Sequence, residues 1–120
     1  MANHFYAYIS RMRCVKRWAL MRNTEEENIQ EHSHMVAVLA HALALIRTRV
    51  FGLPADANAV AVAALYHDAT EILTGDMPTP IKYYNPEIRD AYRKVEAVAS
   101  DKLLSMLPDE LRAGYEPIIK

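Results

Sequence analysis

The 120-residue sequence has little cysteine and little glycine, and each shortage excludes a class of protein. Cys14 is the only cysteine, so no internal disulfide can form, and a reducing cytoplasm is the simplest compartment. It has no partner at metal-ligand spacing, and we expect it to be a small core residue. Only three glycines and few alternating β-branched residues leave little material for a sheet, so the composition predicts an all-α fold.

Long apolar runs and an excess of one charge are also missing. The longest apolar run, residues 35–46, is interrupted by His41 and is too short to cross a bilayer. A net charge of −1 predicts neither a nucleic-acid polymer nor a membrane surface as partner. The first residues lack the basic start and apolar middle of a signal peptide. We therefore expect a cytoplasmic protein whose residues 1–120 form a single domain.

Capping residues and apolar spacing predict two helices in the first half of the chain. Asn3 is a candidate N-cap for a helix whose apolar residues recur at helical spacing as far as Val15. Asn28 and Glu31 form a capping box for a second helix, which ends near Gly52. The second helix carries a stripe of residues that we expect to face the core, namely His32, Val36, Leu39, Leu43, Ile46 and Val50.

The second half of the chain predicts three more helices. A third helix follows Pro54 and should continue to about Thr74, packing antiparallel to the second because the connection is short. Asn85, followed by proline, caps a fourth helix with an apolar face and a solvated charged face. A short last helix should be interrupted by the residues Gly114 and Pro117.

Side chains that could bind a metal or transfer a proton should gather at one end of the second and third helices. His67 and Asp68 are neighbours, and with Glu71 they interrupt an apolar pattern on the third helix. Antiparallel packing brings them close to His32 at the start of the second helix. Buried polar groups cost free energy unless they are satisfied, and two imidazoles with one carboxylate suit a divalent transition metal. The alternative for each histidine is a hydrogen bond to a backbone carbonyl inside the core.

Two other stretches offer groups that suit a phosphorylated ligand. Arg17 directly precedes Trp18, the only tryptophan, and a guanidinium binds phosphate while an indole stacks on a base or sugar. The alternative is an exposed arginine beside a packed tryptophan. Residues 76–80 form a proline-stiffened loop that presents Asp76 and Thr79, or else a plain connection. The acidic residues 25–27 are typical of a solvated turn.

These motifs together resemble those of a known family. The segments RWALMRN (17–23), EHS (31–33), YHDATE (66–71) and LTGDMPTPIKY (73–83) are similar to the bacterial 5′-deoxynucleotidases of the YfbR type. That family belongs to the HD-domain superfamily of metal-dependent phosphohydrolases, and the likeness extends over essentially the whole chain. The resemblance implies an all-helical HD-domain bundle that removes the 5′-phosphate from deoxyribonucleoside 5′-monophosphates.

The resemblance also implies a role for each matched residue. His32, His67 and Asp68 would hold one divalent transition metal, which could be Co²⁺, Mn²⁺, Fe²⁺ or Zn²⁺. Glu71 would orient or deprotonate the attacking water, and Asp76 would help to activate it or hold the sugar. Arg17 would be catalytic by orienting the phosphate. The nucleotide pocket would be lined by Arg17, Trp18, Asp68, Asp76, Met77, Pro78 and Thr79, and would disfavour a 2′-hydroxyl.

One part of the family pattern is missing from the sequence. The family's last metal ligand is an aspartate on a later helix, and none of Asp90, Asp101 and Asp109 stands in its context. We therefore expect an N-terminal fragment that lacks the last helices, and the apolar fourth helix favours a homodimer. Two alternatives stay open, which are an HD hydrolase of another nucleotide or phosphate substrate and a non-catalytic helical module.

Overall fold

The computed structural model describes residues 4–17, 26–75 and 84–120, which form helices and no β-strand. The elements in chain order are α1 (Phe5–Ile9), the 3₁₀ helix η1 (Ser10–Cys14), α2 (Ile29–Arg49), α3 (Ala57–Tyr66), α4 (Glu71–Thr74), α6 (Pro86–Ser105) and α7 (Asp109–Ile119). Within these ranges, no helix is both long enough and apolar enough to cross a membrane. The prediction of an all-α fold is confirmed.

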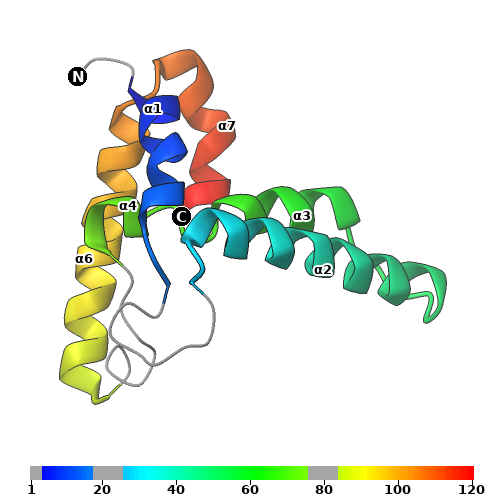
Figure 1. Ribbon diagram of the computed structural model, residues 1–120. Helices are drawn as coiled ribbons and strands as arrows, with labels where there is room; N and C mark the ends of the chain where they lie inside the picture. The colour runs from blue at the N-terminus through cyan, green and yellow to red at the C-terminus, as the bar shows by residue number, and fades with distance from the viewer. Residues whose placement is uncertain (1–3, 18–25, 76–83) are drawn as a thin grey trace.

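The helices form an upright group and a projecting arm, as Figure 1 shows. α1, α6 and α7 stand together, and α4 lies against α6. α2 and α3 lie side by side and run in opposite directions, so that they project from this group as an arm. The predicted antiparallel packing of these two helices is confirmed, and it places the start of α2 near the end of α3.

α2 and α6 begin where their capping residues predict. The Asn28 Oδ1 atom accepts a hydrogen bond from the Glu31 N–H at 2.9 Å, and Asn28 Nδ2 donates to Glu31 Oε1 at 2.7 Å. The Asn85 Oδ1 atom accepts from the Ile88 N–H at 2.8 Å, with Pro86 at the first helical position. Each cap satisfies a backbone donor that has no partner within its own helix.

Replacing Asn28 with alanine should lower the free energy of unfolding by about 1 kcal/mol, because the Glu31 N–H loses its acceptor. Urea unfolding followed by circular dichroism measures the change. Gln30→Ala is the control, since Gln30 is exposed on the same turn and should change stability by less than about 0.5 kcal/mol. Equal stability of Asn28→Ala and the unaltered protein would contradict this account of the cap.

The N-terminal segment is a short α-helix followed by a 3₁₀ helix, rather than the single helix predicted. The Ser10 hydroxyl donates to the Ala7 carbonyl at 2.6 Å, which is a local bond that competes with the regular helical pattern. Val15 is already extended at the end of η1. His4 stands at the N-cap of α1 without a side-chain bond, and the expected cap Asn3 lies outside the described residues.

The third helix also ends earlier than predicted. α3 stops at Tyr66, and a turn leads from it into α4. In this turn the Ala69 N–H bonds to the Tyr66 carbonyl and the Glu71 N–H to the Asp68 carbonyl, each at 3.0 Å. Hydrogen bonds that reach back three residues close a narrower turn than the hydrogen bonds of an α-helix, which reach back four. His67 and Asp68 therefore lie in a turn and not on a continuous helix.

The last helix is longer than predicted, because α7 continues through Gly114 and Pro117. Tyr115 of this helix packs against the core, and Arg112 Nε donates to the Leu104 carbonyl of α6 at 3.2 Å. These tertiary contacts outweigh the weak local preference of glycine and of a proline in the last turn. The predicted interruption was wrong.

The main hydrophobic core lies where α1, α6 and α7 meet the turn that follows α3. Its buried members are Phe5, Ala69, Leu103, Leu104, Met106 and Leu107. Ala69 belongs to the turn and is fully buried. The core therefore anchors the short segment that carries the neighbouring histidine and aspartate.

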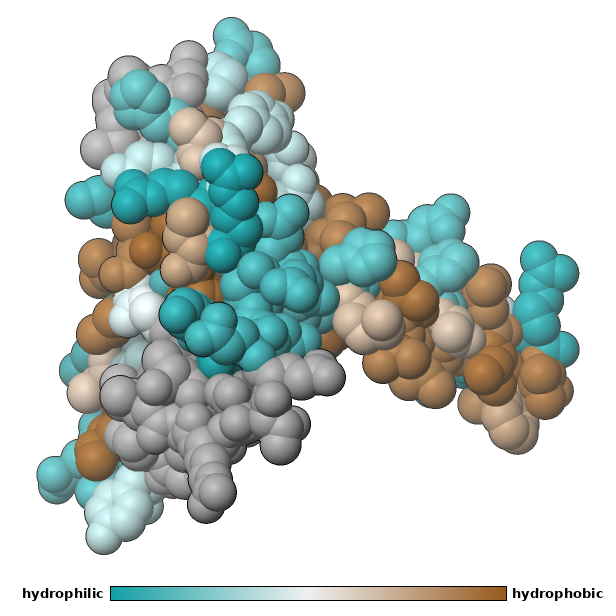
Figure 2. Space-filling view, in the orientation of Figure 1, coloured by the Kyte–Doolittle hydropathy of each residue, from teal (hydrophilic) through white to brown (hydrophobic). Residues whose placement is uncertain are grey.

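The stripe of α2 that was expected to face the core lies mostly on the surface. Leu39, Leu43 and Val50 are 55%, 67% and 70% exposed. The residues of α2 that are buried are instead Ile29, Ser33, Ala37 and Ala44. Small side chains permit close packing against α3, while the larger apolar side chains remain outside. In Figure 2, apolar residues, coloured brown, gather along the arm formed by α2 and α3.

Two other expectations about burial were also wrong. Val95 and Val98 of α6 are exposed, because the buried side of this helix consists of Ala99, Ser100, Leu103 and Leu104. Ala99 and Leu103, on the same expected face, are buried. Cys14, expected in the core, is exposed at the end of η1.

Candidate metal centre

His32, His67 and Asp68 converge at the junction of the arm and the upright group. His32 comes from the first turn of α2, and the other two residues come from the turn after α3. One ligand atom from each residue lies within 4.8 Å of the others. Asp68 Oδ2 is 3.4 Å from His32 Nε2 and 3.1 Å from His67 Nε2. The structure thus brings together the three residues that the sequence proposed as ligands.

The spacing and chemistry of this cluster fit a single divalent cation. Ligand atoms about 2.1 Å from one ion are separated by about 3.0–3.4 Å along the edges of an octahedron or tetrahedron. The two distances from Asp68 are of that size. Two imidazoles and one carboxylate suit Co²⁺, Mn²⁺, Fe²⁺ or Zn²⁺ better than Mg²⁺, which prefers oxygen ligands.

A backbone hydrogen bond orients the ring of His67. Its Nδ1 atom lies 2.6 Å from the Ala64 carbonyl oxygen, and a nitrogen facing a carbonyl carries the proton and donates it. The other ring nitrogen, Nε2, faces Asp68 Oδ2, to which it donates a hydrogen bond when the ring is protonated, and its lone pair is available to a cation when the ring is neutral. The bond to a backbone carbonyl, which the sequence left open as an alternative, is therefore present and is compatible with metal binding.

The environment shifts the pKa values of the two histidines in opposite directions. The hydrogen bond that the His67 ring donates to the Asp68 carboxylate raises the pKa of His67, whereas burial, followed by the charge of Arg17, lowers the pKa of His32. The raised pKa of His67 stabilises the fold below pH 6.5, and this contribution is lost as the pH rises through the folded-state pKa. The lowered pKa of His32 stabilises the fold above pH 6.5, and this contribution is lost as the pH falls.

In metal-free protein, the pKa of His67 should therefore lie above 6.5 and the pKa of His32 below it. A titration of the imidazole ¹H–¹⁵N resonances measures both. Asp68→Asn should lower the pKa of His67, because burial then opposes the charged ring without the carboxylate to offset it. A His67 pKa that does not respond to this substitution would show that the hydrogen bond has been assigned to the wrong group.

Two further charged residues from the sequence prediction stand beside the cluster. Glu71 is buried at the start of α4, and its charge adds to the rise in the pKa of His67. Arg17 follows η1, and its Nη1 atom lies 2.8 Å from Glu27 Oε2. The remaining residues proposed for the nucleotide pocket lie outside the described part of the chain, namely Trp18, Asp76, Met77, Pro78 and Thr79.

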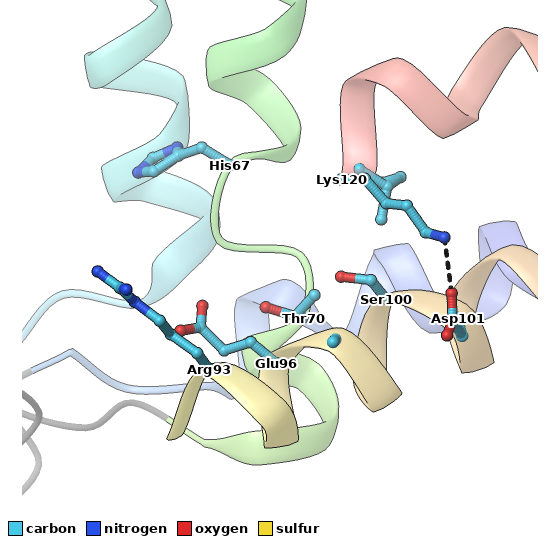
Figure 3. Close-up of a pocket in the computed structure, with 9 residues that line it drawn as sticks. His67, Thr70, Arg93, Glu96, Ser100, Asp101 and Lys120 are labelled. Atoms are coloured by element: carbon cyan, nitrogen blue, oxygen red, sulfur yellow. Dashed lines mark ion pairs between the residues drawn. The ribbon is translucent and has the colours of Figure 1, made fainter. Parts of the chain in front are cut away.

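A cavity of ≈ 450 Å³ opens next to His67, between the turn and the helices α6 and α7 (Figure 3). Figure 3 shows Arg93 and Glu96 extending from α6 on the side where His67 lies. Asp101 lines another part of the cavity and pairs with Lys120 Nζ at 2.9 Å. These charges were expected to lie on a solvated face. Arg93 and Glu96 are three residues apart, which places them on one face of a helix, and this spacing was the available signal.

Comparison with known proteins identifies the family. The model of the family described as 5′-deoxynucleotidase YfbR-like matches residues 4–120. The chain belongs to the YfbR-like family. This YfbR-like chain is 54% identical over 117 residues to 5′-deoxynucleotidase VV1113 of Vibrio vulnificus, and the match covers 98% of the chain and 60% of that relative. It is 51% identical to 5′-deoxynucleotidase plu3092 of Photorhabdus laumondii, with 98% and 59% covered.

A solved structure supports the fold of this YfbR-like chain. An HD-domain phosphohydrolase from Listeria innocua superposes with a TM-score of 0.84 at 24% sequence identity. The likeness covers 100% of the chain and 57% of that structure. The predicted HD-domain helical fold and the family resemblance are confirmed, and the chain spans less than two thirds of the length of these relatives.

Proposed function

We propose that this protein is a metal-dependent phosphomonoesterase that removes the 5′-phosphate from deoxyribonucleoside 5′-monophosphates. The observation that carries the proposal is the cluster of His32, His67 and Asp68, whose ligand atoms lie within 4.8 Å of one another. The relatives described above, which are named 5′-deoxynucleotidases, support the choice of substrate.

Each charged residue has one task in this proposal. His32, His67 and Asp68 hold one divalent transition metal, and what such an ion supplies is polarisation of a phosphoryl oxygen and a lower pKa of water. Glu71 orients the attacking water and accepts its proton. Arg17 contacts the phosphoryl oxygens and stabilises the charge that develops on them. The residues assigned to the sugar and base are Trp18, Asp76, Met77, Pro78 and Thr79.

The test is the release of phosphate from dAMP in the presence of Co²⁺ or Mn²⁺. We expect release that stops on addition of a chelator and returns with the metal, with slower release from AMP. A clear preference for triphosphates would favour an HD hydrolase of another substrate. No release from any nucleotide by metal-loaded protein would favour a non-catalytic helical module, which would also tolerate His32→Ala.

The proposal also includes an oligomeric state and a cellular location. We propose a homodimer, since large apolar side chains such as Leu43 and Val98 are exposed on α2 and α6. Light scattering coupled to gel filtration measures the mass, and a monomer at all concentrations would contradict the dimer. We also propose a cytoplasmic location, which the single cysteine supports and cell fractionation tests.

A further inference from the structure

The segment that carries Arg17 is joined to the start of α2 by backbone hydrogen bonds. The Arg17 N–H donates to the Glu27 carbonyl at 2.7 Å, and the Ile29 N–H donates to the Val15 carbonyl at 2.8 Å. Together they form a short antiparallel contact. The backbone of Arg17 is therefore held next to the N-terminus of α2, whose first turn carries His32.

Glu27 also contacts the side chain of Arg17. Arg17 Nη1 donates to Glu27 Oε2 at 2.8 Å, and the two side chains are only 22% and 37% exposed. The neighbouring pair of Lys16 and Glu26 differs, with 3.6 Å between its charged atoms and exposures of 67% and 83%. A short, partly buried charged hydrogen bond contributes more than an exposed ion pair. Glu27 thus holds Arg17 through both its backbone and its side chain.

The pair lies next to the turn of α2 that carries a candidate metal ligand. The His32 N–H donates to the carbonyl of Asn28 at 3.1 Å, and Asn28 directly follows Glu27 in the chain. An arginine that must meet a phosphate bidentately binds better when its rotamer is already selected. A guanidinium has five N–H donors, so one bond to Glu27 is compatible with contacts to a phosphate.

We propose that Glu27 is a positioning residue for Arg17, whose guanidinium it holds beside His32, His67 and Asp68 in the orientation that meets the substrate phosphate. The part that concerns the phosphate rests on the proposed function, whereas the holding of the guanidinium does not. The sequence motif placed Glu27 in an acidic turn and indicated no partner for it.

The first experiment measures the guanidinium without turnover. In ¹⁵N-arginine-labelled protein, the Nε–H resonance of Arg17 is assigned by its loss in Arg17→Lys. We expect slow rotation about the Nε–Cζ bond in the unaltered protein and in Glu26→Gln, and faster rotation in Glu27→Gln, with Glu27→Asp closer to the unaltered protein. Equal rotation in Glu27→Gln and the unaltered protein would overturn the proposal, and a melting curve of each variant verifies that it is folded.

The second experiment is a double-mutant cycle on the hydrolysis of dAMP. Glu27→Gln should lower kcat/KM about tenfold, as expected for loss of one charge-assisted hydrogen bond, and Glu26→Gln should change it by less than about twofold. In an Arg17→Ala background, Glu27→Gln should have no further effect, because it acts through Arg17. Additive losses would overturn the proposal. If the unaltered protein released no phosphate, the proposed function would fail, and the rotation measurement would still decide whether Glu27 holds Arg17.

Discussion

Replacing Asp68 with asparagine should reduce the release of phosphate from dAMP by about 10³-fold or more, because one carboxylate contacts both histidines of the candidate centre. Its carboxylate is the only anionic group in the cluster of His32, His67 and Asp68, so the neutral amide leaves two imidazoles to hold the cation. Phosphate release and the metal content of the purified variant measure the two consequences.

A matched control separates the loss of a ligand from a general loss of charge. Asp90→Asn removes a carboxylate from exposed Asp90 on α6, where its partner is Arg89 at 3.5 Å. This variant should retain its metal and release phosphate at the rate of the unaltered protein. If Asp68→Asn released phosphate as fast as the unaltered protein and the Asp90→Asn control did so too, the assignment of the metal centre would be refuted.

Replacing Leu103 with alanine should lower the free energy of unfolding by about 2–5 kcal/mol, because the side chain is fully buried and its removal leaves a cavity. This is a large share of the roughly 5–15 kcal/mol by which most domains are stable. Urea unfolding followed by circular dichroism measures it. Leu111→Ala is the control, since Leu111 is 42% exposed and should lose less than about 1 kcal/mol.

The same substitution also tests the link between the core and the site. Leu103 and Ala69 belong to one buried cluster, and Ala69 lies in the turn that carries His67 and Asp68. Loosening this cluster should weaken metal binding together with stability, whereas Leu111→Ala should leave both nearly unchanged. Equal stability of the two leucine variants would show that the core lies elsewhere.

Local signals in the sequence were sufficient to predict several features of the fold. The helix starts at Asn28 and Asn85 depend on a hydrogen bond between residues three apart, so short segments determine them. The short connection after α2 requires antiparallel neighbours, and this was enough to predict that His32 lies near His67.

Features that depend on which surfaces meet were decided by the tertiary structure. Helical spacing defined a stripe on α2 that includes Leu43, but the packed face carries Ala37 and Ala44, because a neighbouring helix approaches small side chains closely. Periodicity identifies an apolar stripe without identifying its partner.

The sequence by itself determined the all-helical class, the caps at Asn28 and Asn85 and the set of residues offered to a metal. Only the tertiary structure decided that His67 and Asp68 lie in a turn anchored by Ala69, and that Glu27 rather than solvent meets Arg17. The reason is the range of the forces involved. Caps and helical periodicity act within a few residues, whereas burial and the pairing of partly buried charges depend on segments that the fold alone brings together.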